Sequence, residues 1–83
     1  MRHAGAAALD LLGDLLEQVP RRHPALRERK RGAFYRGGHA WLHFHEDPAG
    51  LFADLKIDGS WVRLPVNSAA ERAALLRRLK QTL

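Results

Sequence analysis

The sequence has no cysteine among its 83 residues and no long apolar run. Without cysteine, disulfide bonds, thiolate catalysis and cysteine-ligated zinc are excluded, and this composition fits a reducing compartment. The longest apolar stretch, residues 6–16, is interrupted by Asp10, Gly13 and Asp14. It is therefore too polar for a membrane span or for the core of a signal peptide. We expect a cytoplasmic protein that does not enter a membrane.

Motifs of catalysis and nucleotide binding are also missing. Gly37-Gly38 is the one glycine pair, but no helix follows it to bind a phosphate. Ser60 and Ser68 are predicted to lie in a turn and at a helix cap, so no nucleophile stands beside a histidine base. We therefore expect no enzymatic activity and no cofactor. A chain this short forms one domain, residues 1–83, with a single core.

Positive charge is concentrated in one part of the chain. The formal net charge is +5, yet residues 21–36 alone carry seven Lys and Arg side chains against Glu28, a local charge of +6. Such a patch attracts polyanions over a Debye length, about 8 to 10 Å in physiological salt. The alternative is a solvated basic linker. Residues 20–32 are predicted to form this basic connector.

Alternation of apolar and polar residues predicts four strands at residues 33–36, 39–45, 52–58 and 61–66. Gly37-Gly38 suits a tight type I′ or II′ hairpin turn, which pairs Phe34 with Trp41 and Ala33 with Leu42. The turn after residue 57 is predicted as Asp58-Gly59-Ser60-Trp61 in a type II′ conformation, which pairs Ile57 with Val62. A wider loop at residues 46–51 leaves the middle register open, and matching apolar faces pairs Phe44 with Ala53, Leu42 with Leu55 and His43 with Asp54.

Two amphipathic helices flank these strands. After a frayed start at residues 1–5, apolar side chains at helical spacing predict a helix over 6–19, which Pro20 ends. Ser68 and Glu71 form a capping-box pattern that begins a second helix over 69–82. The expected fold is α+β, a two-layer sandwich of order α-β-β-β-β-α in which two helices cover one face of a four-stranded antiparallel meander.

The uncovered face of this sheet is where the sequence places a candidate binding surface. Large aromatic side chains would stack on bases, and cations there and in the basic connector would contact phosphates. The candidate residues are Phe34, Arg36, Trp41, Lys56, Trp61, Arg63, Arg27, Arg29, Lys30 and Arg31. Three alternatives stay open: a homodimer or protein-partner interface, local packing of Phe34 on Trp41, or coverage of the face by the basic segment.

Histidines on the same face are candidates for a metal site. His43 and His45 alternate along one strand and point the same way, and the register places Asp54 beside His43. Imidazole and carboxylate groups are ligands of zinc and similar ions. A carboxylate that hydrogen-bonds a histidine is the simpler interpretation, so the sequence predicts no metal but leaves these three residues as candidates.

The succession Phe-Tyr-Arg-Gly-Gly, a strand, a Leu-Lys strand and Trp-Val-Arg-Leu between Phe34 and Leu64, closed by a helix, resembles small bacterial MmcQ/YjbR-type domains. These domains are often labelled DNA-binding-like, so the resemblance implies contact with nucleic acid. It covers about half of the chain. A longer insertion is typical before the tryptophan strand of those domains, whereas only Asp58 to Ser60 intervene here. The resemblance assigns no role to any residue.

Overall fold

The computed structural model describes residues 1–83, the whole chain. Three helices and six strands follow one another in the order β1 (Arg2–His3), α1 (Ala6–Leu11), α2 (Gly13–Arg22), β2 (Leu26–Lys30), β3 (Ala33–Arg36), β4 (His39–Asp47), β5 (Gly50–Ile57), β6 (Ser60–Pro65) and α3 (Ala69–Thr82). The fold is α+β with one antiparallel sheet, as the alternation and periodicity of the sequence predicted.

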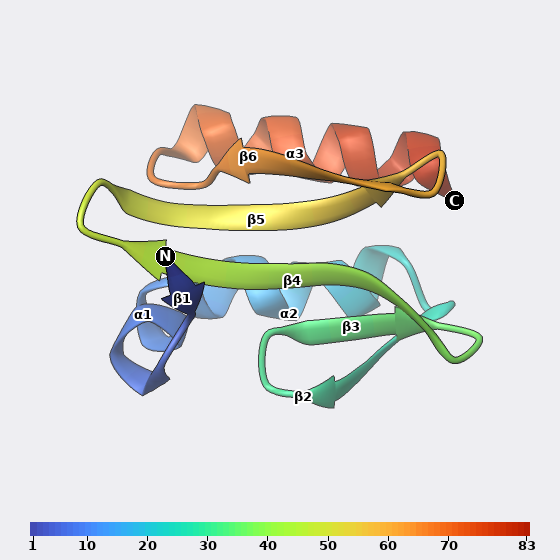
Figure 1. Cartoon of the computed structure of the whole chain (residues 1–83). Coiled ribbons are helices and arrows are strands. Elements are labelled where there is room, and N and C mark those ends of the chain that lie inside the picture. Colours follow the sequence, from blue (N-terminus) through green and yellow to red (C-terminus); the bar gives the residue numbers. More distant parts are fainter.

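The sheet is wider than predicted. Strands β2 to β6 pair in sequence order, so the expected meander is present as β3 to β6, but β2 extends one edge and β1 pairs with β4 beyond the end of β3. Figure 1 shows all three helices behind the sheet and the short β1 lying against β4. The architecture is therefore two-layered, with one face of the sheet packed on helices and the other uncovered.

The predicted basic connector, residues 20–32, is not a connector. Its first residues form the end of α2, and Leu26–Lys30 form the edge strand β2. Leu26 is only 2% exposed and anchors this strand in the core, whereas the four residues after it are exposed. Because β2 continues the sheet beside β3, the basic segment does not fold over the uncovered face, and that alternative is wrong.

The predicted frayed start is wrong as well. Arg2 and His3 pair with Glu46 and His45 of β4, and the amide of Ala4 donates to the carbonyl of Phe44 at 3.0 Å. The Glu46 carboxylate accepts hydrogen bonds from the Arg2 side chain and from the amide of Gly5. These contacts need a strand partner far along the chain, so no local pattern in the first five residues could indicate them.

The first helix differs from the prediction at both its middle and its end. It divides into α1 and α2 at Leu12, directly before Gly13, a residue that costs about 1 kcal/mol in a helix interior. Pro20 does not stop α2, which continues to Arg22. A proline inside a helix costs about 3 kcal/mol, but full burial of a Leu or Val side chain contributes about 1.5 to 3 kcal/mol each. Leu15, Leu16 and Val19 are all buried by this helix and offset the cost.

A β-bulge changes the register of the first hairpin. Arg36 pairs with His39 as predicted, but Phe34 pairs with Leu42 and Ala33 with His43, which leaves Trp41 as the extra residue of β4. The predicted pairs Phe34–Trp41 and Ala33–Leu42 are therefore wrong. Phe34 is completely buried in the core, and Tyr35 lies on the uncovered face instead. The alternation of the sequence assigned Phe34 and Tyr35 to the wrong faces of the sheet, because alternation alone does not reveal an inserted residue such as Trp41.

The other two hairpin turns differ from the prediction, one in position and one in length. Asp58 and Gly59 are the two loop residues between Ile57 and Ser60, and their φ angles of 50° and 81° are typical of a type I′ turn rather than II′. Leu55 rather than Ile57 pairs with Val62, a shift of two residues that preserves the faces. Asp47 pairs with Gly50, so the predicted wide loop is a two-residue turn. The middle pairs Phe44–Ala53, Leu42–Leu55 and His43–Asp54 are confirmed.

The last helix, α3, has the predicted bounds of 69–82, and its capping box is present. Ser68 accepts from the Glu71 amide, and the Glu71 carboxylate accepts from the Ser68 amide. Leu75, Leu76 and Leu79 of this helix join the core formed by α1, α2 and the covered face of the sheet. None of the three helices combines the length and the apolar character that crossing a membrane requires.

Candidate functional site

The uncovered face of the sheet, named the open face below, carries histidines, aromatic rings and charged side chains from β1 to β6. Directly paired residues of antiparallel strands share a face. The observed registers, together with the contact of Arg29 with the Tyr35 ring, place on this face the side chains considered below: His3, Arg27, Arg29, Lys30, Tyr35, His43, His45, Phe52, Asp54, Lys56, Trp61 and Arg63. None of these side chains is part of the buried core. The face is polar and aromatic, in contrast to the aliphatic core behind it.

Three rings form a row across the open face. The ring centroids of Tyr35 and His43 are 6.2 Å apart, and those of His43 and Trp61 are 5.2 Å apart. A cation lies over each end of the row: the Arg29 guanidinium is 4.8 Å from the centre of the Tyr35 ring, and the Lys56 ammonium is 4.7 Å from the Trp61 ring. Trp61 is 45% exposed and is the most accessible large aromatic side chain of the protein.

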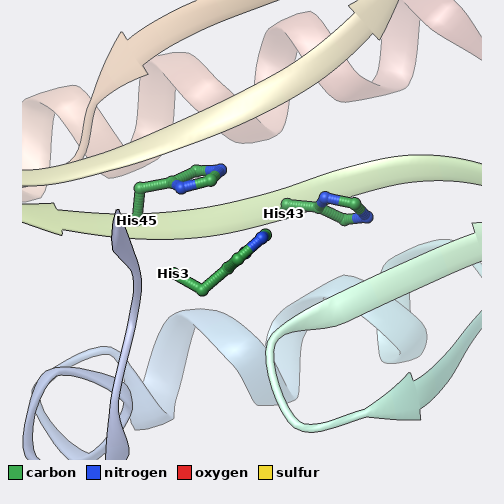
Figure 2. A group of neighbouring side chains, drawn as sticks. All are labelled: His3, His43 and His45. Carbon is green, nitrogen blue, oxygen red and sulfur yellow. The ribbon is translucent and has the colours of Figure 1, made fainter. Parts of the chain in front are cut away.

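A cluster of three histidines adjoins this row. His43 and His45 come from β4, two residues apart, and His3 comes from β1, whose backbone pairs His3 with His45. Figure 2 shows the three side chains near one another at β4. One ring nitrogen from each histidine can be chosen so that all three nitrogens lie within 4.8 Å of one another. The rings of His3 and His45 are stacked, with centroids 4.6 Å apart.

Asp54 connects this cluster to β6. Its carboxylate accepts two hydrogen bonds of 2.8 Å from the Arg63 guanidinium, and Oδ2 lies 3.0 Å from Nε2 of His45. The hydrogen bonds from Arg63 are the main cause that holds the pKa of Asp54 below its ordinary value, so this carboxylate stays ionised. The side chains of His45 and Asp54 are each only 13% exposed, which strengthens their interaction relative to a surface pair.

The pKa values of His43 and His45 both lie below the ordinary value of a histidine, which favours the neutral imidazole. Partial burial lowers the pKa of His43, and the neighbouring His3 and His45 lower it further. Burial also lowers the pKa of His45, although Asp54 opposes this effect. His43 has one further property: its Nε2 atom is buried and has no hydrogen-bond partner. An unsatisfied buried polar atom of this kind costs about 1 to 3 kcal/mol. Hydrogen bonding of Nε2 within the protein therefore does not account for the buried position of the His43 ring.

Several predicted binding residues lie away from the open face. Phe34 is buried in the core and is not available for stacking. Trp41 packs against the core at the helix side, where its indole N–H donates to the Thr82 hydroxyl of α3 at 3.1 Å. Arg36 lies over the Trp41 ring on that same side, at 5.3 Å. Arg31 pairs with Asp10 of α1.

The remaining predicted residues are on the open face: Lys56, Trp61, Arg63, Arg27, Arg29 and Lys30 share it with the metal candidates His43, His45 and Asp54. Sequence reasoning missed His3 and Tyr35. Tyr35 was missed because the bulge at Trp41 of β4 shifts the pairing with β3, so that Tyr35 rather than Phe34 lies on the open face. The long-range pairing of β1 with β4 was needed to find His3.

In comparisons with known proteins, no family model, no curated protein and no solved structure matches this chain. The resemblance to MmcQ/YjbR-type domains therefore stays a prediction, and the candidate site is defined by the geometry of this chain alone.

Proposed function

We propose that the open face binds single-stranded nucleic acid, with little choice of sequence, by stacking bases on Tyr35 and Trp61 while cations contact phosphates. The observation that carries this proposal is the row Tyr35–His43–Trp61 with a cation over each end. Rings displayed on a sheet accept any base, because every base has a π face. Paired bases inside a duplex do not present their faces, so we expect single strands to bind better.

The charges of the face support the same ligand. Arg27, Arg29 and Lys30 of the edge strand are exposed beside Tyr35, and Lys56 lies beside Trp61. Two carboxylates lie on this side of β4 and β5, and both are paired: Asp54 with the Arg63 guanidinium and Asp47 with the amine of Met1. The face therefore carries an excess of positive charge that attracts a polyanion.

The cations over the rings do not prevent stacking. A cation–π contact at an exposed position contributes about 0.5 to 1 kcal/mol, whereas stacking of a base on an aromatic side chain contributes about 1 to 3 kcal/mol. A base therefore displaces the Lys56 ammonium from Trp61, and the released ammonium is close enough to bind the adjoining phosphate.

The test is an anisotropy titration with labelled single-stranded DNA and RNA, at about 50 and 200 mM salt. We expect binding that weakens steeply as salt rises, because phosphate contacts release counterions. Trp61→Ala is expected to weaken binding by about 5- to 150-fold, the equivalent of about 1 to 3 kcal/mol of stacking. The matched control is Trp41→Phe, which changes the other tryptophan, on the helix side of the sheet, and should leave affinity unchanged. Absence of binding at the lower salt concentration, or equal loss in the two variants, would contradict the proposal.

A second copy of the chain is the competing occupant of the same face, because Trp61 is exposed and no helix covers this side of the sheet. Light scattering over a range of concentrations distinguishes the two uses. A stable dimer that Trp61→Ala dissociates, together with no affinity for oligonucleotides, would favour self-association and reject the nucleic-acid proposal.

A further inference from the structure

We infer that His3, His43 and His45 form a binding site for a divalent zinc ion on the open face. The inference is independent of nucleic-acid binding, because it depends only on these three side chains and their surroundings. The sequence alone offered His43, His45 and Asp54 as candidates. The structure replaces Asp54 by His3 as the third member of the cluster.

The placement of the three imidazoles fits a common ion. Zinc binds histidine nitrogens at about 2.0 to 2.1 Å, which puts neighbouring ligands of a tetrahedral site about 3.3 Å apart. The three ring nitrogens lie within 4.8 Å of one another, so each must move by about 1 Å to reach that geometry. His3 is exposed and belongs to a strand of two residues, so its side chain has room for this adjustment.

The scaffold fixes two of the ligands. His43 and His45 are separated by one residue on β4, which pairs with β5 on one side and with β3 and β1 on the other. Ligands on paired strands hold their positions better than ligands on loops. The third, His3, is placed opposite His45 by the backbone pairing of β1, and that strand is held by Glu46 through Arg2 and Gly5.

The surroundings suit a cation bound by neutral ligands. Histidines that bind zinc commonly have a carboxylate beside the ring, which orients it and increases its basicity. Asp54, 3.0 Å from His45, is such a carboxylate, and Arg63 holds it in place from the far side. The nearby Arg2 is paired with Glu46, so its charge is compensated. Three nitrogen ligands leave the fourth position of the ion to water.

Zinc chloride titrated into the 83-residue chain, produced without an added histidine tag, tests this site. We expect one ion per chain by calorimetry and by elemental analysis after dialysis. His3→Gln and His45→Gln should each weaken zinc binding at least about tenfold, since even loss of a supporting residue around a zinc site costs 10- to 100-fold. His39→Gln is the matched control, because His39 is an exposed histidine on β4 outside the cluster, and its affinity should equal that of the unmodified chain.

Two results would overturn the site: no bound zinc, or a loss in His39→Gln as large as in His3→Gln. Because His3 is exposed, His3→Gln should keep the fold, which a circular-dichroism spectrum and a thermal melt without metal will establish. Side-chain NMR of the histidines gives a second readout: zinc should shift the ring signals of His3, His43 and His45 and leave those of His23 and His39 in place. No nucleic acid is present in these experiments, so their outcome is separate from that of the oligonucleotide titration.

Discussion

His3 and His45 are direct partners across β1 and β4, and their rings stack at 4.6 Å. Through this pair the first residues of the chain reach the centre of the open face, next to the row Tyr35–His43–Trp61. Strand β1 has only two residues, so its attachment is weaker than that of the other strands. Anything that binds His3 and β4 together should stabilise this strand.

The proposed zinc site therefore predicts slower exchange of the Ala4 amide, which donates to the Phe44 carbonyl. Opening of β1 requires release of His3 from the ion, so free zinc at 100 times its dissociation constant should slow this exchange by about 100-fold. Hydrogen exchange followed by NMR measures the effect. His3→Gln should abolish the slowing, and equal protection of Ala4 with and without zinc would contradict the prediction.

Phe34 and Tyr35 are predicted to have opposite mutational effects. Phe34 is completely buried, so Phe34→Ala should reduce the free energy of unfolding by about 3 to 5 kcal/mol through the lost burial and the cavity. Tyr35 lies on the open face, so Tyr35→Ala should reduce oligonucleotide affinity and cost less stability. Urea unfolding and the anisotropy titration measure the two quantities. The reverse order of stabilities would show that the bulge at Trp41 is misplaced.

Arg63 should matter less for nucleic-acid binding than Arg29 or Lys56. Both of its hydrogen bonds go to Asp54, which neutralises its charge, whereas Arg29 and Lys56 lie over aromatic rings with no carboxylate partner. Each phosphate contact contributes about one unit to the slope of log affinity against log salt. We expect that slope to fall by about one in Arg29→Ala and Lys56→Ala and to change little in Arg63→Ala. An equal change in all three variants would contradict this assignment.

Two glycines should respond to alanine in opposite directions. Gly13 has open space around it and no positive φ angle, so Gly13→Ala should stabilise the start of α2 by about 0.4 to 1 kcal/mol. Gly50 has φ of +135°, and a Cβ there would lie 2.6 Å from the Asn67 amide oxygen, which accepts the Leu51 amide. Gly50→Ala should destabilise the protein by about 1 to 3 kcal/mol. Thermal unfolding of both variants measures the contrast, and stabilisation by Gly50→Ala would contradict it.

Local patterns in the sequence were sufficient for much of the fold. The capping box at Ser68 and Glu71 marked the start of α3, and alternation found the cores of β3 to β6. The pairing of His43 with Asp54 followed from matching apolar faces, because a one-residue slip would bury Asp54 and Lys56. These features depend on residues close together or on a strict two-residue period.

The candidate site depended on contacts that have no local pattern. The bulge at Trp41 exchanged the faces of Phe34 and Tyr35 and moved Trp41 to the helix side, where Thr82 accepts its indole hydrogen bond. The pairing of β1 with β4 brought His3 to His43 and His45, which are 40 and 42 positions away in the sequence (43 − 3 and 45 − 3). The sequence by itself determined that one sheet face is apolar and the other polar and aromatic, because side chains alternate along a strand. Only the tertiary structure decided which rings share the open face, because an inserted residue and a distant strand pairing change which side chains meet without changing the local alternation.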